Sequence, residues 1–161
     1  MNAVDIHTGD DLRELYRELI LDHARSPRHF GKLDDATHTA EGINPLCGDK
    51  LRLFVRLDAD GKISAASFEG SGCAISVASA SLLTDMIIGL TVTQALDSFA
   101  AVTGRLTGSD TSYEFDAAID LGKMRALDGV REFPSRVKCA TLAWHALSSA
   151  IHGQSTPVST E

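Results

Sequence analysis

The residues from Lys50 to Asp58 carry an aliphatic side chain at every second position. Because successive side chains of a strand point to opposite faces, this alternation predicts a half-buried strand. Asp60 and Gly61 then supply turn chemistry, and Lys62–Glu69 is predicted to return as a second strand. The simplest connection is an antiparallel hairpin, to which Thr37–Ile43 could add a third strand at the edge.

Apolar residues with helical spacing surround this hairpin. They predict helices over about 11–25, from Cys73 to about Leu90, over 92–102 with Gly104 as the C-terminal cap, and over about 136–151. Thr91 and Gln94 form a capping box ahead of the third of these helices. The order of elements predicts an α+β fold, in which helices pack on a small antiparallel sheet of about three strands.

Length and charge limit the classes of function. A chain of 161 residues is predicted to form a single domain over 1–161, with a core over about 10–152, flexible termini and a loose tail after Gly153. No apolar run is long enough for a membrane helix, and the acidic, polar start does not resemble a targeting signal, so we expect a cytoplasmic protein. A net charge of −7 without a basic block argues against nucleic acid as a partner.

The chain has three cysteines, an odd number that favours metal binding or thiol chemistry over disulfides. Cys47 lies on a turn between Pro45 and Gly48, with Asp49 two residues later, and Cys73 and Cys139 lie near predicted helix starts, where the helix dipole favours thiolates. Three thiolates and one carboxylate would complete a tetrahedral site for Zn²⁺ or for iron–sulfur chemistry. The spacing alone is a weak signal, because a single free cysteine is most often a buried apolar residue.

Arg136 and Lys138 stand in the predicted first turn of the last helix, where cations oppose the helix dipole. A nearby anionic metal site would balance them, whereas the alternative is that both extend into water. We expect Arg136 to lie against the site, paired with Asp49, and to help to control the release of Cys47.

Three separated motifs resemble the IscU/NifU-N-terminal family of iron–sulfur cluster assembly proteins, and most closely its SufU branch. They are Asn-Pro-Leu-Cys-Gly-Asp at 44–49, Phe-Glu-Gly-Ser-Gly-Cys-Ala-Ile-Ser at 68–76 and Arg-Val-Lys-Cys-Ala-Thr-Leu at 136–142. The resemblance covers nearly the whole chain and implies an IscU-like (SufE/NifU-like) α+β fold. IscU scaffolds have a histidine immediately before the third cysteine, where this chain has Lys138, and an insertion at about 105–133 is typical of SufU.

The resemblance implies a set of roles for this chain. Cys47, Asp49, Cys73 and Cys139 would be zinc ligands, and Cys47 would also accept sulfur from the persulfide of a pyridoxal-phosphate-dependent, SufS-like cysteine desulfurase. The protein would then be a sulfurtransferase-type partner of that enzyme rather than an autonomous enzyme, and would pass sulfur to a downstream iron–sulfur scaffold. Two alternatives remain, namely a scaffold that binds an iron–sulfur cluster through the same thiols, and a domain in which zinc only stabilises the fold.

Overall fold

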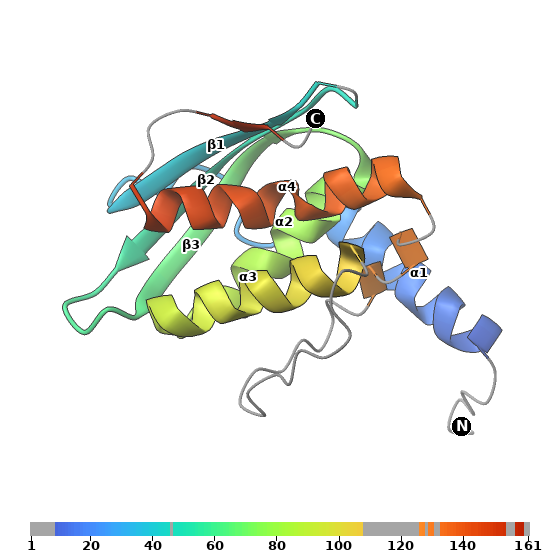
Figure 1. Ribbon diagram of the computed structural model, residues 1–161, viewed down its shortest axis with the longest axis horizontal. Helices are drawn as coiled ribbons and strands as arrows, with labels where there is room; N and C mark the ends of the chain where they lie inside the picture. Colours follow the sequence, from blue (N-terminus) through green and yellow to red (C-terminus); the bar gives the residue numbers. More distant parts are fainter. Residues whose placement is uncertain are drawn as a thin grey trace.

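The computed structural model describes residues 9–45, 47–107, 126–127, 129–130, 133–153 and 157–159. These residues form an α+β fold, in which helices lie on one face of a small mixed sheet (Figure 1). In chain order the elements are α1 (Gly9–Arg25), β1 (His38–Asn44), β2 (Asp49–Leu57), β3 (Ile63–Ser71), α2 (Ala74–Ile87), α3 (Val92–Thr107), α4 (Pro134–Ile151) and β4 (Val158–Ser159).

The sheet has the strand order β3-β2-β1-β4. The predicted hairpin is present as β2 and β3, and β1 pairs antiparallel with β2. The prediction of about three strands is wrong, because Val158 and Ser159, in the expected loose tail, pair in parallel with Gly42 and Ile43. β1 therefore lies inside the sheet rather than at its edge. A strand of two residues carries no periodicity, so only its long-range pairing defines it.

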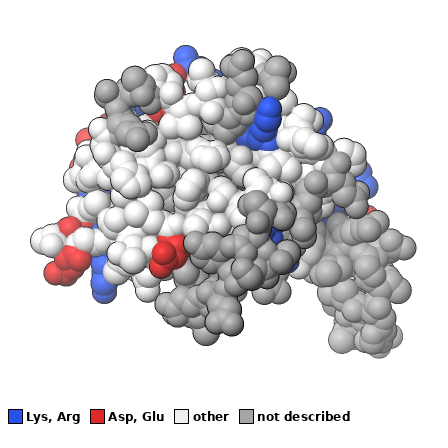
Figure 2. Space-filling model, viewed as in Figure 1, with Lys and Arg blue, Asp and Glu red and all other residues white. Residues whose placement is uncertain are grey.

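The helices bury one face of the sheet. α4 packs on β1 and β2, α2 packs on β3 and on α4, and α1 packs on α2. The core between these layers is aliphatic and aromatic, and its largest fully buried side chains include Trp144, Phe68, Leu53, Leu142 and Leu147. Charged pairs lie on the opposite face, where Glu41 contacts Lys50 at 3.3 Å and Arg52 at 3.6 Å. By contrast, the described surface on the helical side is largely uncharged (Figure 2).

The helix ends test the local predictions. Thr91 and Gln94 form the predicted capping box, with reciprocal hydrogen bonds of 3.0 and 3.1 Å between their side chains and backbone N–H groups. Gly104 is not a C-terminal cap, because α3 continues to Thr107. α1 begins at Gly9 rather than Asp11, and α4 begins at Pro134, ahead of the predicted start.

Two predictions from the sequence stay open. Most of the insertion predicted at about 105–133 lies outside the described residues, as do both chain ends. The assignment of 1–161 to a single domain therefore stays a prediction. Within the described ranges, no helix combines the length and the hydrophobicity needed to cross a membrane.

Candidate metal centre

Cys47 lies on the turn that joins β1 to β2. The register of the two strands places Asn44 opposite Asp49, and the Cys47 N–H donates to the Asn44 carbonyl at 3.2 Å. Gly48 has a φ of 72°, a left-handed conformation that favours glycine over residues with a side chain. The turn leaves Cys47 partly exposed, in contrast to the buried Cys139.

Asp49 is the first residue of β2 and is 2% exposed. Its Oδ1 accepts a hydrogen bond of 2.8 Å from the Cys73 N–H, and its Oδ2 lies 4.0 Å from the Cys73 sulfur. Gly72 makes this approach possible, because a Cβ at that position would lie 2.5 Å from Asp49 Oδ1. The carboxylate thus joins the β1–β2 turn to the start of α2.

Cys73 is the N-cap of α2. Its sulfur accepts a hydrogen bond from the Ser76 N–H at 3.5 Å. The sulfur thus acts as the side-chain acceptor of the N-cap, a part that a serine or aspartate oxygen commonly plays. The positive end of the helix dipole lies beside this sulfur. The predicted location of Cys73 at a helix start is confirmed.

Cys139 is fully buried on α4, beyond the first turn rather than at the helix end. The N-cap of this helix is Phe133, and the Ser135 carbonyl lies 3.5 Å from the Cys139 sulfur. A second neighbour is Asn44, whose Nδ2 lies 3.6 Å from the same sulfur. The Cys139 thiol is therefore held from both the helix and β1.

Four donor side chains from three parts of the chain converge here. The Cys47 and Cys139 sulfurs are 3.4 Å apart, and the donor atoms of Cys47, Asp49 and Cys139 all lie within 4.8 Å of one another. Cys73 stands beside this group of three through its contact with Asp49. Ligand atoms of a tetrahedral zinc site with Zn–S distances of about 2.3 Å would be about 3.8 Å apart. The Cys47 and Cys139 thiols and the Asp49 carboxylate fit a zinc ion in both donor chemistry and spacing, and Cys73 offers a third thiol beside them.

The ionisation of Cys139 depends on its burial and on its neighbours in the cluster. Burial raises the pKa of Cys139 well above its usual range, and hydrogen bonds with Asp49, Cys47 and Cys73 add to this effect. Without a cation, the buried thiol is therefore held in its protonated form. A bound divalent cation would oppose this effect by stabilising the thiolate.

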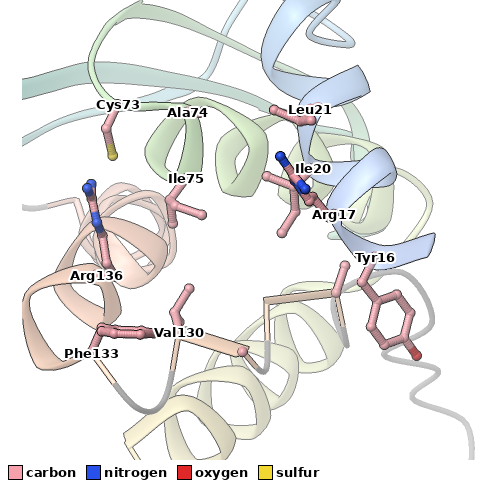
Figure 3. A pocket seen from close by; sticks show the side chains of 12 residues that line it. Tyr16, Arg17, Ile20, Leu21, Cys73, Ala74, Ile75, Val130, Phe133 and Arg136 are labelled. Atoms are coloured by element: carbon pink, nitrogen blue, oxygen red, sulfur yellow. The ribbon is translucent and has the colours of Figure 1, made fainter. Parts of the chain in front are cut away.

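Arg136 lies on the solvent side of these thiols. Its pKa is raised, chiefly by the negative charge that Cys73 carries when ionised and then by that of Cys139 when ionised. Figure 3 shows its guanidinium directed toward the Cys73 sulfur. The structure shows no ion pair between Arg136 and Asp49, so the charge that Arg136 faces is that of the thiols.

A cleft of about 550 Å³ opens beside Cys73, between α1, the start of α2 and the start of α4 (Figure 3). Its described lining is mostly apolar, including Ile20, Ile75 and Val130, and its charged members are Arg17 and Arg136. Phe133 at its rim is 57% exposed. The cleft thus has a mostly apolar lining with two positively charged side chains, and it adjoins the thiol cluster.

Two other side chains of α4, His145 and Trp144, lie away from the thiol cluster. His145 is on a different face of α4 from Cys139 and packs edge-on against Phe99, with ring centroids 5.3 Å apart, while burial lowers its pKa. Trp144 is fully buried in the core. The residue that sequence reasoning missed is Asn44, which is fully buried at the end of β1. The only signal in the sequence was an asparagine three residues before Cys47, which gives no indication of a contact with Cys139.

Comparison with known proteins places this fold in a family. The model of the NifU-like N terminal domain matches residues 15–154. The chain is 43% identical over 141 residues to the zinc-dependent sulfurtransferase SufU of Bacillus subtilis, covering 88% of this chain and 92% of that protein. It is 41% identical over 140 residues to the iron-sulfur cluster assembly scaffold protein IscU of Streptococcus pyogenes, covering 87% of this chain and 84% of that protein.

A solved structure agrees with the sequence relatives. The putative iron-sulfur cluster assembly scaffold protein for the SUF system from Fervidobacterium islandicum superposes with a TM-score of 0.76 at 35% identity, covering 86% of this chain and 98% of that one. The predicted α+β, IscU-like fold is confirmed by this likeness. From the matched residues and these relatives, the chain belongs to the NifU-like N-terminal domain family.

Proposed function

We propose that this protein is a zinc-dependent sulfur acceptor that takes persulfide sulfur from a cysteine desulfurase for iron–sulfur cluster assembly. The observation that carries the proposal is the cluster of Cys47, Asp49 and Cys139, with Cys73 beside it, in which the Cys47 thiol lies on a partly exposed turn. The 43% identity to a protein named zinc-dependent sulfurtransferase supports it.

Cys47, Asp49, Cys73 and Cys139 would hold the zinc ion. Zinc would keep the thiols ionised at neutral pH and would not itself oxidise the carried sulfur, because it has no redox chemistry. The ion would also balance the negative charges of the buried Cys139 thiolate and Asp49 carboxylate.

The transfer step needs only a thiolate from this chain. The Cys47 thiolate attacks the terminal sulfur of the donor's persulfide, so that a new S–S bond forms on Cys47 while the S–S bond of the donor breaks. The donor's cysteine leaves as a thiolate, and no net oxidation occurs. Arg136 faces the anionic cluster and stabilises its negative charge during this exchange.

The cleft beside Cys73 supports a docking surface for the desulfurase. Its described lining contains two arginines and no acidic residue, although the whole chain has a net charge of −7. We expect the donor to present an apolar side chain next to a carboxylate, which would pack in the cleft and pair with Arg17.

Arg17→Glu tests this docking surface. Loss of one partly desolvated ion pair, worth about 1.4 kcal/mol, would raise the desulfurase concentration at half-maximal transfer about tenfold and leave the maximal rate unchanged. Arg25→Glu, at the exposed end of the same helix, is the matched control. Equal effects of the two variants would show that general charge, not the cleft, governs docking.

Two measurements test the proposed function itself. Protein purified without reconstitution is expected to contain one equivalent of tightly bound zinc and no iron. After incubation with desulfurase and cysteine, mass spectrometry of alkylated peptides is expected to find persulfide mainly on Cys47.

The second candidate is a cluster scaffold, favoured by the 41% identity to a protein named as one. Bound iron with visible colour in the purified protein would support the scaffold instead. Bound zinc without persulfide on any cysteine would leave zinc as a purely structural ion.

A further inference from the structure

The three sulfurs of the cluster differ in the N–H groups that point at them. Cys73 Sγ accepts from the Ser76 backbone N–H at 3.5 Å, and Cys139 Sγ accepts from Asn44 Nδ2 at 3.6 Å. For Cys47 Sγ, the neighbour that the described residues provide is another sulfur, that of Cys139. Cys47 Sγ accepts from the Cys139 S–H at 3.4 Å, a donor that is lost when Cys139 ionises. Among the described residues, the Cys73 and Cys139 sulfurs therefore each have an amide donor, and the partly exposed Cys47 sulfur has none.

Asn44 is fixed in position by its backbone as well as by its burial. It is 0% exposed, pairs with Asp49 across the two strands, and its carbonyl accepts from the Cys47 N–H at 3.2 Å. Its Oδ1 has no hydrogen-bond partner among the described residues. A buried amide whose oxygen has no hydrogen-bond partner lowers the stability of the fold. An apolar residue would avoid this cost, so we expect the N–H directed at Cys139 to have a function.

Hydrogen bonds to a metal-bound thiolate draw electron density from the sulfur and change its reactivity. A thiolate with an amide donor is the poorer nucleophile, and one without a donor is the better nucleophile. We propose that Asn44 is a positioning residue that suppresses the reactivity of Cys139 and so makes Cys47 the thiol that reacts. This inference rests on the proposed zinc–thiolate site.

A matched pair of substitutions isolates the hydrogen bond. Asn44→Thr and Asn44→Val have nearly the same shape and both suit a strand, but only threonine can donate to the sulfur. Each zinc-loaded variant is treated with substoichiometric iodoacetamide, and early alkylation at each cysteine is measured by peptide mass spectrometry. In the wild type we expect Cys47 to be modified first.

In Asn44→Val the share of alkylation at Cys139 relative to Cys47 is expected to rise about fivefold, the factor that a typical net hydrogen bond contributes. Asn44→Thr is expected to stay closer to the wild type. Val55→Ala, a core truncation in β2 away from the sulfurs, controls for general loosening of the fold. Equal shares in the two Asn44 variants, or an unchanged share in Asn44→Val, would overturn the proposal.

A second readout does not depend on alkylation or on sulfur transfer. With cobalt(II) in place of zinc, the thiolate-to-cobalt absorption is expected to differ between Asn44→Val and Asn44→Thr, and identical spectra would contradict the proposal. If Asn44→Val does not fold, Asn44→Ser and Asn44→Ala provide the same comparison of donor with no donor. Absence of bound zinc in the wild-type protein would count against the proposed function. The alkylation shares and cobalt spectra of the Asn44 variants count for or against the role of Asn44 alone.

Discussion

The β1–β2 turn and the starts of α2 and α4 bring their thiols to one place but hold them differently. Cys47 stands on a turn of a few residues, is partly exposed, and is followed by a glycine with positive φ. Cys73 is a helix N-cap, and Cys139 is buried on α4 against two neighbouring polar groups. In the proposed zinc site we therefore expect Cys73 and Cys139 to be the anchored ligands and Cys47 to be the ligand that leaves most easily.

Replacing the cysteines one at a time is the most direct test of whether Cys47 and the two helix cysteines have different roles. We expect Cys47→Ser to abolish sulfur acceptance while retaining part of the bound zinc, because the anchored donors remain. Cys139→Ser should instead lose most of its zinc, since an anchored ligand is removed. Zinc content and persulfide formation are measured on both variants. Undiminished transfer by Cys47→Ser would contradict the assignment of the acceptor.

Asp49 belongs to both regions, because it begins β2 and accepts from the Cys73 N–H. Asp49→Ala is expected to lower zinc affinity by at least the roughly 10- to 100-fold typical of losing a supporting group at a metal site. Competition with a chromophoric chelator measures this affinity. Asp35→Ala, which removes an exposed carboxylate paired with Arg56, is the control and should leave the affinity unchanged. An unchanged affinity in Asp49→Ala would show that Asp49 is not a ligand.

Substitutions of Arg136 test the part of the thiol cluster that α2 and α4 form. Its guanidinium is exposed and faces the Cys73 and Cys139 thiolates, so Arg136→Ala should slow sulfur acceptance several-fold and hardly alter the melting temperature. Arg136→Lys should restore part of the rate, because it keeps the charge. Transfer at the wild-type rate in Arg136→Ala would mean that the side chain only extends into water.

Gly48 tests the freedom of the turn. Gly48→Ala places a side chain at a φ of 72° and is expected to cost about 1 kcal/mol of unfolding free energy. Gly61→Ala is a close match, because Gly61 has a φ of 77° and neither position has an atom within 4 Å of an added Cβ. Denaturant titration should give similar losses for both, and only Gly48→Ala should change the transfer rate. Equal transfer rates would show that the freedom of this turn does not limit the reaction.

The sequence predicted best those features that depend on near neighbours. The Thr91–Gln94 capping box closes within three residues, and the β2–β3 hairpin is defined by its own alternation and its Asp-Gly turn. β4 was missed because its pairing with β1 spans most of the chain. Gly104 was misread because a glycine inside a helix looks the same in sequence as one that ends it.

The site shows the same limit. The spacing of Cys47, Cys73 and Cys139 gave only a weak signal, and the motifs around them carried the prediction. The three cysteines come close to one another because of the way α4 packs on β1, and no local sequence pattern encodes this packing. The hydrogen bond from Asn44 to Cys139 joins residues 95 positions apart, so it became visible only in three dimensions.

β4 has a consequence for the behaviour of the protein in solution. Without Val158 and Ser159, β1 would expose unpaired N–H and C=O groups at Gly42 and Ile43, close to the turn that carries Cys47. An open strand edge is a template on which other extended chains can add, and such addition leads to aggregation. The short C-terminal strand therefore covers part of the edge of β1 and reduces the chance that the sheets of two molecules pair there.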